Sequence, residues 1–251
     1  MNNILIKSPK QIKFIRKACN LAAECLRFAE KNIKIGITTK NLNYLIEDFI
    51  YSRGGLPACL NYNGFPFATC MSVNSCLCHG LPSNYKLQNG DMLKIDICVN
   101  LNGYIGDTCK TFCIGDISDI GYKLIEAGKK ALEIGINQVK PGNQYNEIGF
   151  YIEEWIKNNT TFSICEDFCG HQSGVYLHEV GRPINHVFDP SNTDIMRKSE
   201  IFCIEPIIME KSNKIKIGED GFSIFSVDEG LSVQNESQIL ITKNSFEVLT
   251  I

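Results

Sequence analysis

The sequence predicts an α+β fold in which pairs of helices cover one face of a curved antiparallel sheet. Three observations support this prediction. Four segments repeat apolar residues at helical spacing, other segments alternate like strands, and the helical segments occur as two pairs separated by strands. The chain has 251 residues, of which 44% are hydrophobic, so it can bury a full core. We expect one domain, residues 1–251.

The first helix is expected from Ser8 to about residue 31. Ser8 can cap it, Pro9 suits the first helical position, and Gln11 completes a capping box. Its buried stripe comprises Ile12, Ile15, Ala18, Ala22, Cys25 and Leu26. A second helix is expected over residues 39–52, and two glycines end it.

A second pair of helices is expected over residues 119–134 and 144–157. It repeats the first pair at an offset of 106 residues, which aligns Lys34-Ile35-Gly36 with Lys140-Pro141-Gly142. The same offset aligns Leu42 with Ile148, Ile46 with Ile152, Phe49 with Trp155, and Ile50 with Ile156. This repeat indicates two similar halves, about residues 1–115 and 116–251, because solenoid repeats are much shorter.

Strands are expected on either side of the second helix pair. Residues 92–99 and 105–113 alternate like strands, and Asn102-Gly103 between them is a strong hairpin signal. Further strands are expected over residues 201–208, 221–227 and 237–242.

Two aspartates lie in this hairpin. Asp96 stands in an apolar run, where a carboxylate is costly unless it is paired or binds a metal. The hairpin register places Asp107 opposite Cys98, so the two aspartates become diagonal neighbours roughly 7–8 Å apart or less. One interpretation is that a carboxylate reaches solvent or is capped by Lys94 or Lys110. The other is that a cation separates the pair. The hairpin alone leaves both open.

Two further acids lie in strand-like contexts. Glu205 stands in an apolar run, and Glu236 lies just before an expected strand. Four carboxylates and one histidine would form an oxygen-rich ligand set, which suits two ions of Mn²⁺, Fe²⁺, Co²⁺ or Zn²⁺.

Three histidines lie near these acids or in glycine-rich segments, namely His79, His171 and His178. Each histidine alone is more often a partly buried residue with satisfied hydrogen bonds than a metal ligand. The spacing of His171 and His178 places them on opposite faces of a regular strand. A shared site therefore requires a bend, which Gly174 permits.

The charge and hydropathy of the chain exclude several classes of partner. The net charge is −3, and no run of Lys or Arg supports binding to nucleic acid or an anionic membrane. No apolar stretch approaches the roughly 20 residues of a membrane span, and the first residues lack the apolar core of a signal peptide. We therefore expect a cytoplasmic protein with neither a DNA nor a membrane partner.

Twelve cysteines are scattered along the chain without a Cys-x-x-Cys pair. We expect free, buried thiols. The alternative is structural zinc at one of two clusters: Cys76, Cys78 and His79, or Cys165, Cys169 and His171. The one-residue gaps in these clusters are too short for the usual zinc spacing.

The order of the candidate ligands resembles the dinuclear site of the methionine aminopeptidases, and of the type I enzymes in particular. These ligands are Asp96, Asp107, His171, Glu205 and Glu236. The flanking motifs are similar too: Tyr62-Asn63-Gly64-Phe65-Pro66, Cys78-His79-Gly80-Leu81-Pro82, Gly106-Asp107-Thr108, Cys169-Gly170-His171 and Phe202-Cys203-Ile204-Glu205-Pro206. The resemblance spans nearly the whole chain. It implies the pita-bread fold of peptidase family M24, with two pseudo-symmetric halves.

The resemblance also implies a mechanism. The five ligands would hold two divalent ions, with Asp107 and Glu236 bridging them, and a metal-bridging hydroxide would attack the first peptide bond. Glu205 would relay protons, His178 would stabilise the oxyanion, and His79 would bind the scissile amide nitrogen.

The substrate implied by the resemblance is the initiator methionine of nascent proteins and peptides. Its side chain would enter a sulfur-tolerant apolar pocket lined by Cys59, Tyr62, Phe65, Cys70, Leu177 and Phe222. A monovalent cation would bind near Asn74, the carbonyl of Cys76, and Ser232. The expected partner is a polypeptide N-terminus at the ribosome, and the expected state is a monomer.

Three positions depart from the family pattern. Gln172-Ser173 follow His171, Ser237-Gln238 follow Glu236, and Leu177 replaces a usual aromatic residue. None of these changes removes a ligand. They concern substrate preference and turnover, because residues beside ligands orient them.

Two alternative functions share the same scaffold. An Xaa-Pro aminopeptidase is one, although such enzymes usually carry a large extra N-terminal domain. A non-catalytic binding protein is the other, although such relatives lose ligands that this chain keeps.

Overall fold

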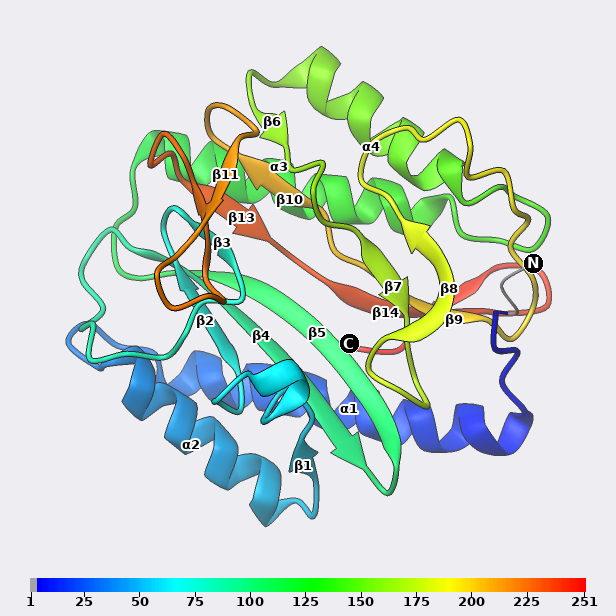
Figure 1. Cartoon of the computed structure of the whole chain (residues 1–251), viewed down its shortest axis with the longest axis horizontal. Coiled ribbons are helices and arrows are strands. Elements are labelled where there is room, and N and C mark those ends of the chain that lie inside the picture. Colours follow the sequence, from blue (N-terminus) through cyan, green and yellow to red (C-terminus); the bar gives the residue numbers. More distant parts are fainter. Residues whose placement is uncertain (1–3) are drawn as a thin grey trace.

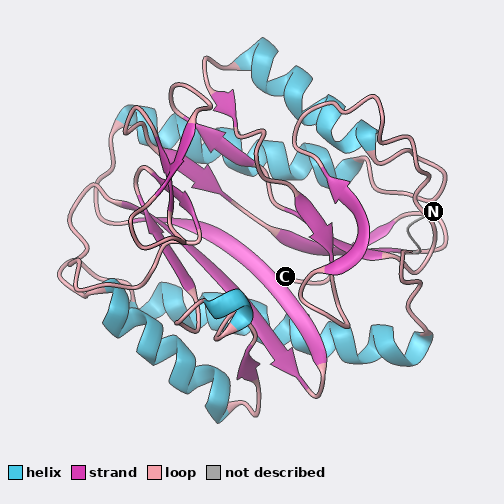
Figure 2. Cartoon of the chain, in the orientation of Figure 1, coloured by secondary structure: helices cyan, strands magenta, loops and turns pink. Residues whose placement is uncertain are grey.

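The computed structural model describes residues 4–251. Helices α1 (Pro9–Asn32) and α2 (Thr39–Ser52) lie along one side of the molecule, and α3 (Asp119–Asn137) and α4 (Asn146–Asn159) along the opposite side, with strands between the two pairs (Figure 1). Helix α1 packs against the long hairpin strands, and α3 packs against shorter strands of the second half. The segregation of helices from antiparallel strands confirms the predicted α+β class (Figure 2).

The helix ends follow local chemistry. The predicted capping box of α1 is present: the Ser8 hydroxyl accepts the N–H of Gln11 at 3.3 Å, and the Ser8 N–H donates to the Gln11 side chain at 2.9 Å. Helix α2 has the predicted bounds, whereas α3 runs on to Asn137. Helix α4 begins later than predicted, because Gln144 instead forms a β-bridge with Ile195.

The hairpin of β4 (Met92–Leu101) and β5 (Tyr104–Cys113) has the predicted register, with Cys98 paired to Asp107. Asn102 and Gly103 both have positive φ, 55° and 83°, as a tight two-residue hairpin turn requires. Strand β4 also pairs with β1 (Leu56–Pro57) and β2 (Cys70–Val73).

The strand predicted over residues 201–208 is wrong in one respect, because it divides into β9 (Ile201–Ile204) and β10 (Ile207–Met209). Pro206 lacks an N–H and cannot continue the ladder. Strand β9 pairs with β14 (Ser237–Ile241), and β10 pairs with β13 (Ser232–Gln234). The two interruptions face each other, so Glu205 and Glu236 both lie where the ladder is open.

The remaining strands are short and surround this centre. Strand β9 also pairs with β7 (Gly170–Gln172), which pairs with β8 (Glu179–Ile184). The other short elements are η1 (Tyr62–Gly64), β3 (Cys76–Cys78), β6 (Ser163–Ile164), β11 (Ile215–Ile217), β12 (Ile224–Ser226) and β15 (Phe246–Val248). Strand β12 is shorter than the predicted strand 221–227, because Gly221 has a positive φ of 77° and belongs to a turn.

Each helix pair covers a hydrophobic core of its own. Leu42, Ile46 and Ile50 of α2 belong to one core, and their partners at the 106-residue offset, Ile148, Ile152 and Ile156 of α4, belong to another. All six are buried. Within residues 4–251, no helix combines the length and the apolar character needed to cross a membrane.

Candidate metal centre

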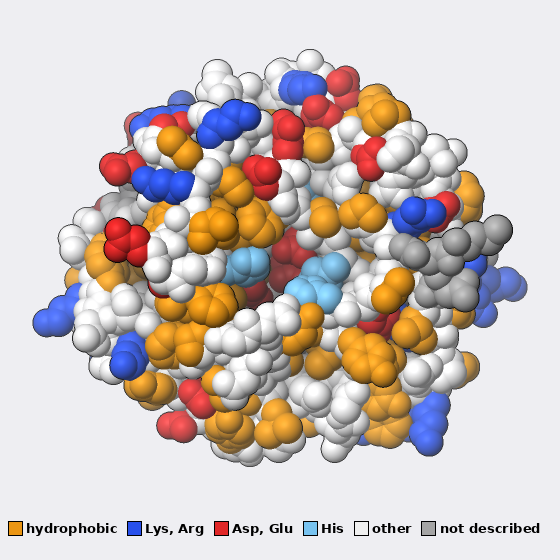
Figure 3. Space-filling view, in the orientation of Figure 1, with side chains coloured by type: hydrophobic (Ala, Val, Ile, Leu, Met, Phe, Trp, Pro, Cys, Tyr) orange, Lys and Arg blue, Asp and Glu red, His pale blue; other side chains and the backbone are white. Residues whose placement is uncertain are grey.

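A cavity of about 340 Å³ opens between the two sets of strands. Figure 3 shows it as a hollow with acidic side chains at its floor and histidines beside them. Every residue proposed from the sequence as a divalent-metal ligand, catalytic group or pocket lining borders it: Cys59, Tyr62, Phe65, Cys70, His79, Asp96, Asp107, His171, Leu177, His178, Glu205, Phe222 and Glu236. The fold thus gathers residues separated by well over a hundred positions.

Two groups of ligand atoms share one aspartate. Asp96, Cys98 and Asp107 place ligand atoms within 4.8 Å of one another, and so do Asp107, His171, Cys203 and Glu236. The hairpin register explains why the aspartates meet, since Cys98 pairs with Asp107 and Asp96 lies two residues away on the same strand face. Asp107 therefore belongs to both groups of ligand atoms.

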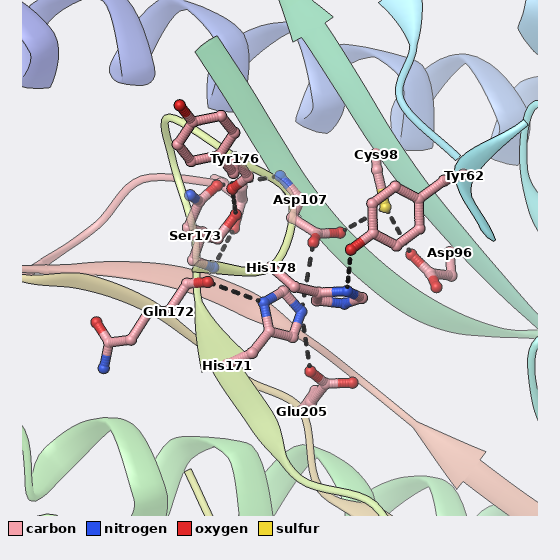
Figure 4. Close-up of polar contacts among 12 residues, drawn as sticks. Tyr62, Asp96, Cys98, Asp107, His171, Gln172, Ser173, Tyr176, His178 and Glu205 are labelled. Carbon is pink, nitrogen blue, oxygen red and sulfur yellow. Dashed lines mark hydrogen bonds and ion pairs between the residues drawn. The ribbon is translucent and has the colours of Figure 1, made fainter. Parts of the chain in front are cut away.

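His171 faces the carboxylates through its Nε2 atom, which lies 3.7 Å from Asp107 Oδ2 and 3.5 Å from Glu205 Oε1 (Figure 4). Its Nδ1 lies 3.2 Å from the carbonyl oxygen of Gln172. A proton on Nδ1 would leave the Nε2 lone pair directed at the carboxylates, which is the form a metal ligand needs. Burial lowers the pKa of His171 to about 3, which keeps the ring neutral.

The expected bend between the two histidines is present at Gly174, whose φ is 130°. It brings the ring centroids of His171 and His178 to 4.2 Å. The Nδ1 atom of His178 lies 2.8 Å from the hydroxyl of Tyr62. If this hydroxyl donates, the Nε2–H of His178 is free to point at a ligand in the cavity.

Asp107 and Glu236 are buried, Asp96 and Glu205 are half-buried, and within residues 4–251 no lysine or arginine forms a salt bridge with any of the four. Burial is the main cause that raises the pKa of Asp96, Glu205 and Glu236 well above the usual range, and their mutual repulsion adds to it. One oxygen each of Glu205 and Glu236 is buried without a hydrogen-bond partner. Buried groups of this kind are costly unless they bind a cation, so the donor set fits divalent metal ions.

The interpretation in which a lysine caps an aspartate does not hold. Lys110 forms a salt bridge with Glu30 at 3.1 Å on the surface. Lys94 is buried and donates to Asn74 and Ser232. Neither amine therefore neutralises Asp96 or Asp107. Asp107 is buried, whereas Asp96 is half-buried and keeps some contact with solvent.

The contacts of Lys94 correct one expectation. Its Nζ lies 2.8 Å from the carbonyl oxygen of Asn74 and 2.9 Å from that of Ser232, where a monovalent cation was expected. A side chain of the protein thus takes the place of the ion. Burial lowers the pKa of Lys94 to about 8.

Side-chain amides hold the ligand segments in place. Gln234 Nε2 donates to Glu205 Oε2 at 3.0 Å, and the backbone N–H of Asp107 donates to Gln238 Oε1 at 3.0 Å. Gln172 and Gln238 are two of the residues that depart from the pattern described above. The side chain of Gln172 donates to the Tyr145 hydroxyl at 3.3 Å. The departures at Gln172 and Gln238 therefore form part of the hydrogen-bonded support of the ligands.

Sequence reasoning missed two cysteines. Cys98 Sγ lies 2.9 Å from Asp107 Oδ1 and 3.7 Å from Asp96 Oδ1, and Cys203 belongs to the group around Glu236. Strand alternation was the available signal, since Cys98 follows Asp96 by two positions and Cys203 precedes Glu205 by two. All twelve cysteines are free thiols, of which ten are buried. Within residues 4–251, His171 groups with carboxylates and Cys203, and not with Cys165 and Cys169.

An apolar wall adjoins the carboxylates. Cys59, Phe65, Cys70, Cys98 and Leu177 form one hydrophobic cluster with Ile105. The ring of Phe65 packs edge-to-face on Phe222 at 5.6 Å. The cavity therefore offers an apolar, sulfur-rich pocket directly beside a group of metal ligands.

Metal binding should weaken as the pH falls. Burial raises the pKa of Asp107 to about 7, and an ion must displace the proton held below that pH. Protonation of Asp107 alone should reduce the apparent affinity for the metal ion about tenfold between about pH 8 and about pH 6. His171 stays neutral over this range, so it does not contribute to the change. Calorimetric titration with Mn²⁺ in buffers of different ionisation enthalpy measures both affinity and released protons. Equal affinity across this range, with no protons released, would contradict the prediction.

Comparison with known proteins gives consistent matches. A model of metallopeptidase family M24 matches residues 13–243. A methionine aminopeptidase of Haemophilus influenzae is 37% identical over 99% of this chain and 93% of its own length, and the mitochondrial methionine aminopeptidase 1D of Homo sapiens is 37% identical over 99% and 73%. A crystal structure of methionine aminopeptidase from Rickettsia prowazekii has a TM-score of 0.96 at 34% identity, covering 99% of this chain and 100% of that one.

Proposed function

The chain belongs to metallopeptidase family M24, and we propose on this basis that it is a methionine aminopeptidase of the pita-bread fold. In this function it removes the N-terminal methionine from peptides and nascent proteins. One observation carries the proposal. An apolar, thiol-lined pocket lies directly beside two groups of potential metal ligands, and Asp107 belongs to both groups. The pocket suits a thioether side chain, and the carboxylates suit two divalent ions.

We assign the metal ligands as Asp96, Asp107, His171, Glu205 and Glu236; of these, Asp107 and Glu236 would be shared by the two ions. When bound, Mn²⁺, Fe²⁺, Co²⁺ or Zn²⁺ would activate water and polarise the substrate carbonyl. Cys98 and Cys203 also face the ligand group, and softer metals favour thiolate ligands.

The side chains around the cavity divide the remaining work. Glu205 takes a proton from the attacking water and returns it to the leaving amine. His178, neutral because burial lowers its pKa, donates from Nε2 to the oxygen on which charge develops. His79 lies at the cavity wall and hydrogen-bonds the scissile amide nitrogen. The methionine side chain lies among Cys59, Tyr62, Phe65, Cys70, Leu177 and Phe222.

We further propose a single catalytic domain of two related halves that acts as a monomer in the cytoplasm, on chains leaving the ribosome. The separate cores under the two helix pairs support the division into halves. The free thiols support a reducing compartment.

The test is methionine release by purified protein supplied with Mn²⁺, Co²⁺ or Fe²⁺. We expect release from peptides that begin Met-Gly or Met-Ala, and none from the same peptides with Ala in place of the first Met. Absence of release with every metal would contradict the proposal. Cleavage of an Xaa-Pro peptide in its place would favour the Xaa-Pro aminopeptidase alternative. Metal binding without cleavage of either peptide would favour the non-catalytic alternative.

A further inference from the structure

A buried lysine lies behind the metal centre without an acidic partner. Lys94, 1% exposed, precedes Asp96 by two residues in β4. Its Nζ donates to the carbonyl oxygen of Asn74 at 2.8 Å, and to the carbonyl and hydroxyl oxygens of Ser232 at 2.9 and 3.0 Å. Within residues 4–251, no carboxylate forms a salt bridge with it. A buried amine whose contacts are all neutral oxygens is unusual, because buried charges are normally paired.

The number of acceptors defines the form of the amine. Three oxygens around one nitrogen use three N–H donors, which only the ammonium form has. The Ser232 hydroxyl has its own acceptors, the carbonyl oxygens of Asn74 at 3.1 Å and Cys76 at 3.3 Å, so its lone pairs face Nζ. Three neutral oxygens thus accept from one positively charged group, and the Cys76 carbonyl lies beside them on the Ser232 hydroxyl. Carbonyl and hydroxyl oxygens are also the ligands that replace the hydration shell of K⁺.

This oxygen cradle, made by Asn74, Cys76 and Ser232, is held by contacts that do not involve Lys94. The Asn74 side chain donates to Asp91 at 2.9 Å and accepts from the backbone N–H of Met92 at 2.9 Å. Ser232 pairs with Met209 in the ladder of β10 and β13. The oxygens should therefore stay in place when the lysine is shortened.

We propose that the Lys94 ammonium is a built-in monovalent cation, and that shortening this side chain converts the oxygen cradle into a binding site for K⁺ or a similar small cation. The ammonium group occupies the position that a dissolved cation would otherwise fill. A tethered cation cannot be diluted away, so the stability of the natural chain should not respond to K⁺.

The cradle also joins three elements that carry parts of the metal centre. Lys94 lies on the strand of Asp96, and Asn74 precedes β3, which leads to His79. Ser232 begins β13, where Gln234 donates to Glu205. Lys94 is thus a positioning residue, because its hydrogen bonds fix the strands from which the ligands project.

The experiment compares Lys94→Ala with Lys94→Met. Alanine leaves the oxygens open to an ion, whereas methionine fills most of the same volume and donates nothing. Thermal unfolding of the metal-free protein is followed in potassium chloride, methylammonium chloride and choline chloride at equal ionic strength. Choline is the control, because it is too large for a space vacated by an amine and a few methylenes.

We expect K⁺ or methylammonium to raise the unfolding temperature of Lys94→Ala by at least about 3 °C over choline, and to change that of the natural chain or Lys94→Met by less than about 1 °C. An equal response of the natural chain or of Lys94→Met would overturn the proposal. The proposal would also be overturned if the unfolding temperature of Lys94→Ala did not respond to K⁺ or methylammonium. The same holds if Lys94→Ala failed to fold with every cation while Lys94→Met folded. These readouts do not depend on peptidase activity. In an added arm, which rests on the proposed function, K⁺ should restore methionine release to Lys94→Ala only.

Discussion

Replacing Glu205 by Gln should lower the rate of methionine release at least about 10³-fold, since under the proposed assignment it removes a metal ligand and a proton carrier together. Gln234 Nε2 already donates to Glu205 Oε2 at 3.0 Å, and Glu205 Oε1 lies 3.5 Å from His171 Nε2. An amide has the size of the carboxylate, but it takes up no proton in this range and binds a hard cation less well. Glu205→Ala should lose the same activity.

Release by Glu205→Gln is measured at saturating metal, and bound metal is quantified in the same preparation. The matched control is Glu133→Gln, which changes an exposed glutamate on α3 that forms a surface salt bridge with Lys130. That control should keep full activity, because exposed pairs contribute little. Undiminished release by Glu205→Gln would remove Glu205 from the mechanism.

Replacing Asp107 by Ala should impair both metal ions, whereas replacing Asp96 should impair mainly one. The structural reason is that Asp107 contributes to both groups of ligand atoms and Asp96 to one. For Asp107→Ala, we expect a loss of affinity beyond the roughly 10–100-fold that follows removal of an outer hydrogen-bond partner. For Asp96→Ala, we expect one tight ion to remain.

Elemental analysis after dialysis gives the metal stoichiometry, and calorimetric titration gives the affinity. Asp116→Ala, which removes an exposed aspartate just beyond β5, is the matched control and should bind both ions normally. Circular dichroism of each variant separates lost metal from lost fold. Equal stoichiometry in Asp96→Ala and Asp107→Ala would contradict the shared role of Asp107.

Much of the fold was predictable because its longest elements are defined locally. Helical spacing and the capping box of Ser8 place α1, and the Asn102-Gly103 turn sets the register that pairs Cys98 with Asp107. The short strands were not predictable, because two or three residues show no period. The break between β9 and β10 had a local signal in Pro206, which the apolar run around it obscured.

The site was predictable in part for a different reason. Hairpin register alone brings Asp96 to Asp107, but no local rule brings Glu205 and Glu236 beside them. Their order along the chain, matched to a family, supplied that step. Lys94 shows what local patterns cannot predict. Strand alternation places it on the same face as Asp96. Its hydrogen-bond acceptors, however, include Ser232, which is distant in the sequence, and no periodicity reveals that contact.

The paired interruptions at Glu205 and Glu236 have a consequence for the timing of biosynthesis. A chain synthesised only through β10 already contains Asp96, Asp107, His171 and Glu205, but it lacks Glu236, which lies between β13 and β14. Long-range pairings of this kind form late, because loop closure must precede them. The five proposed ligands therefore come together only after β13 and β14 have paired with β10 and β9. Until then, Glu205 also lacks the hydrogen bond that Gln234 of β13 donates to it.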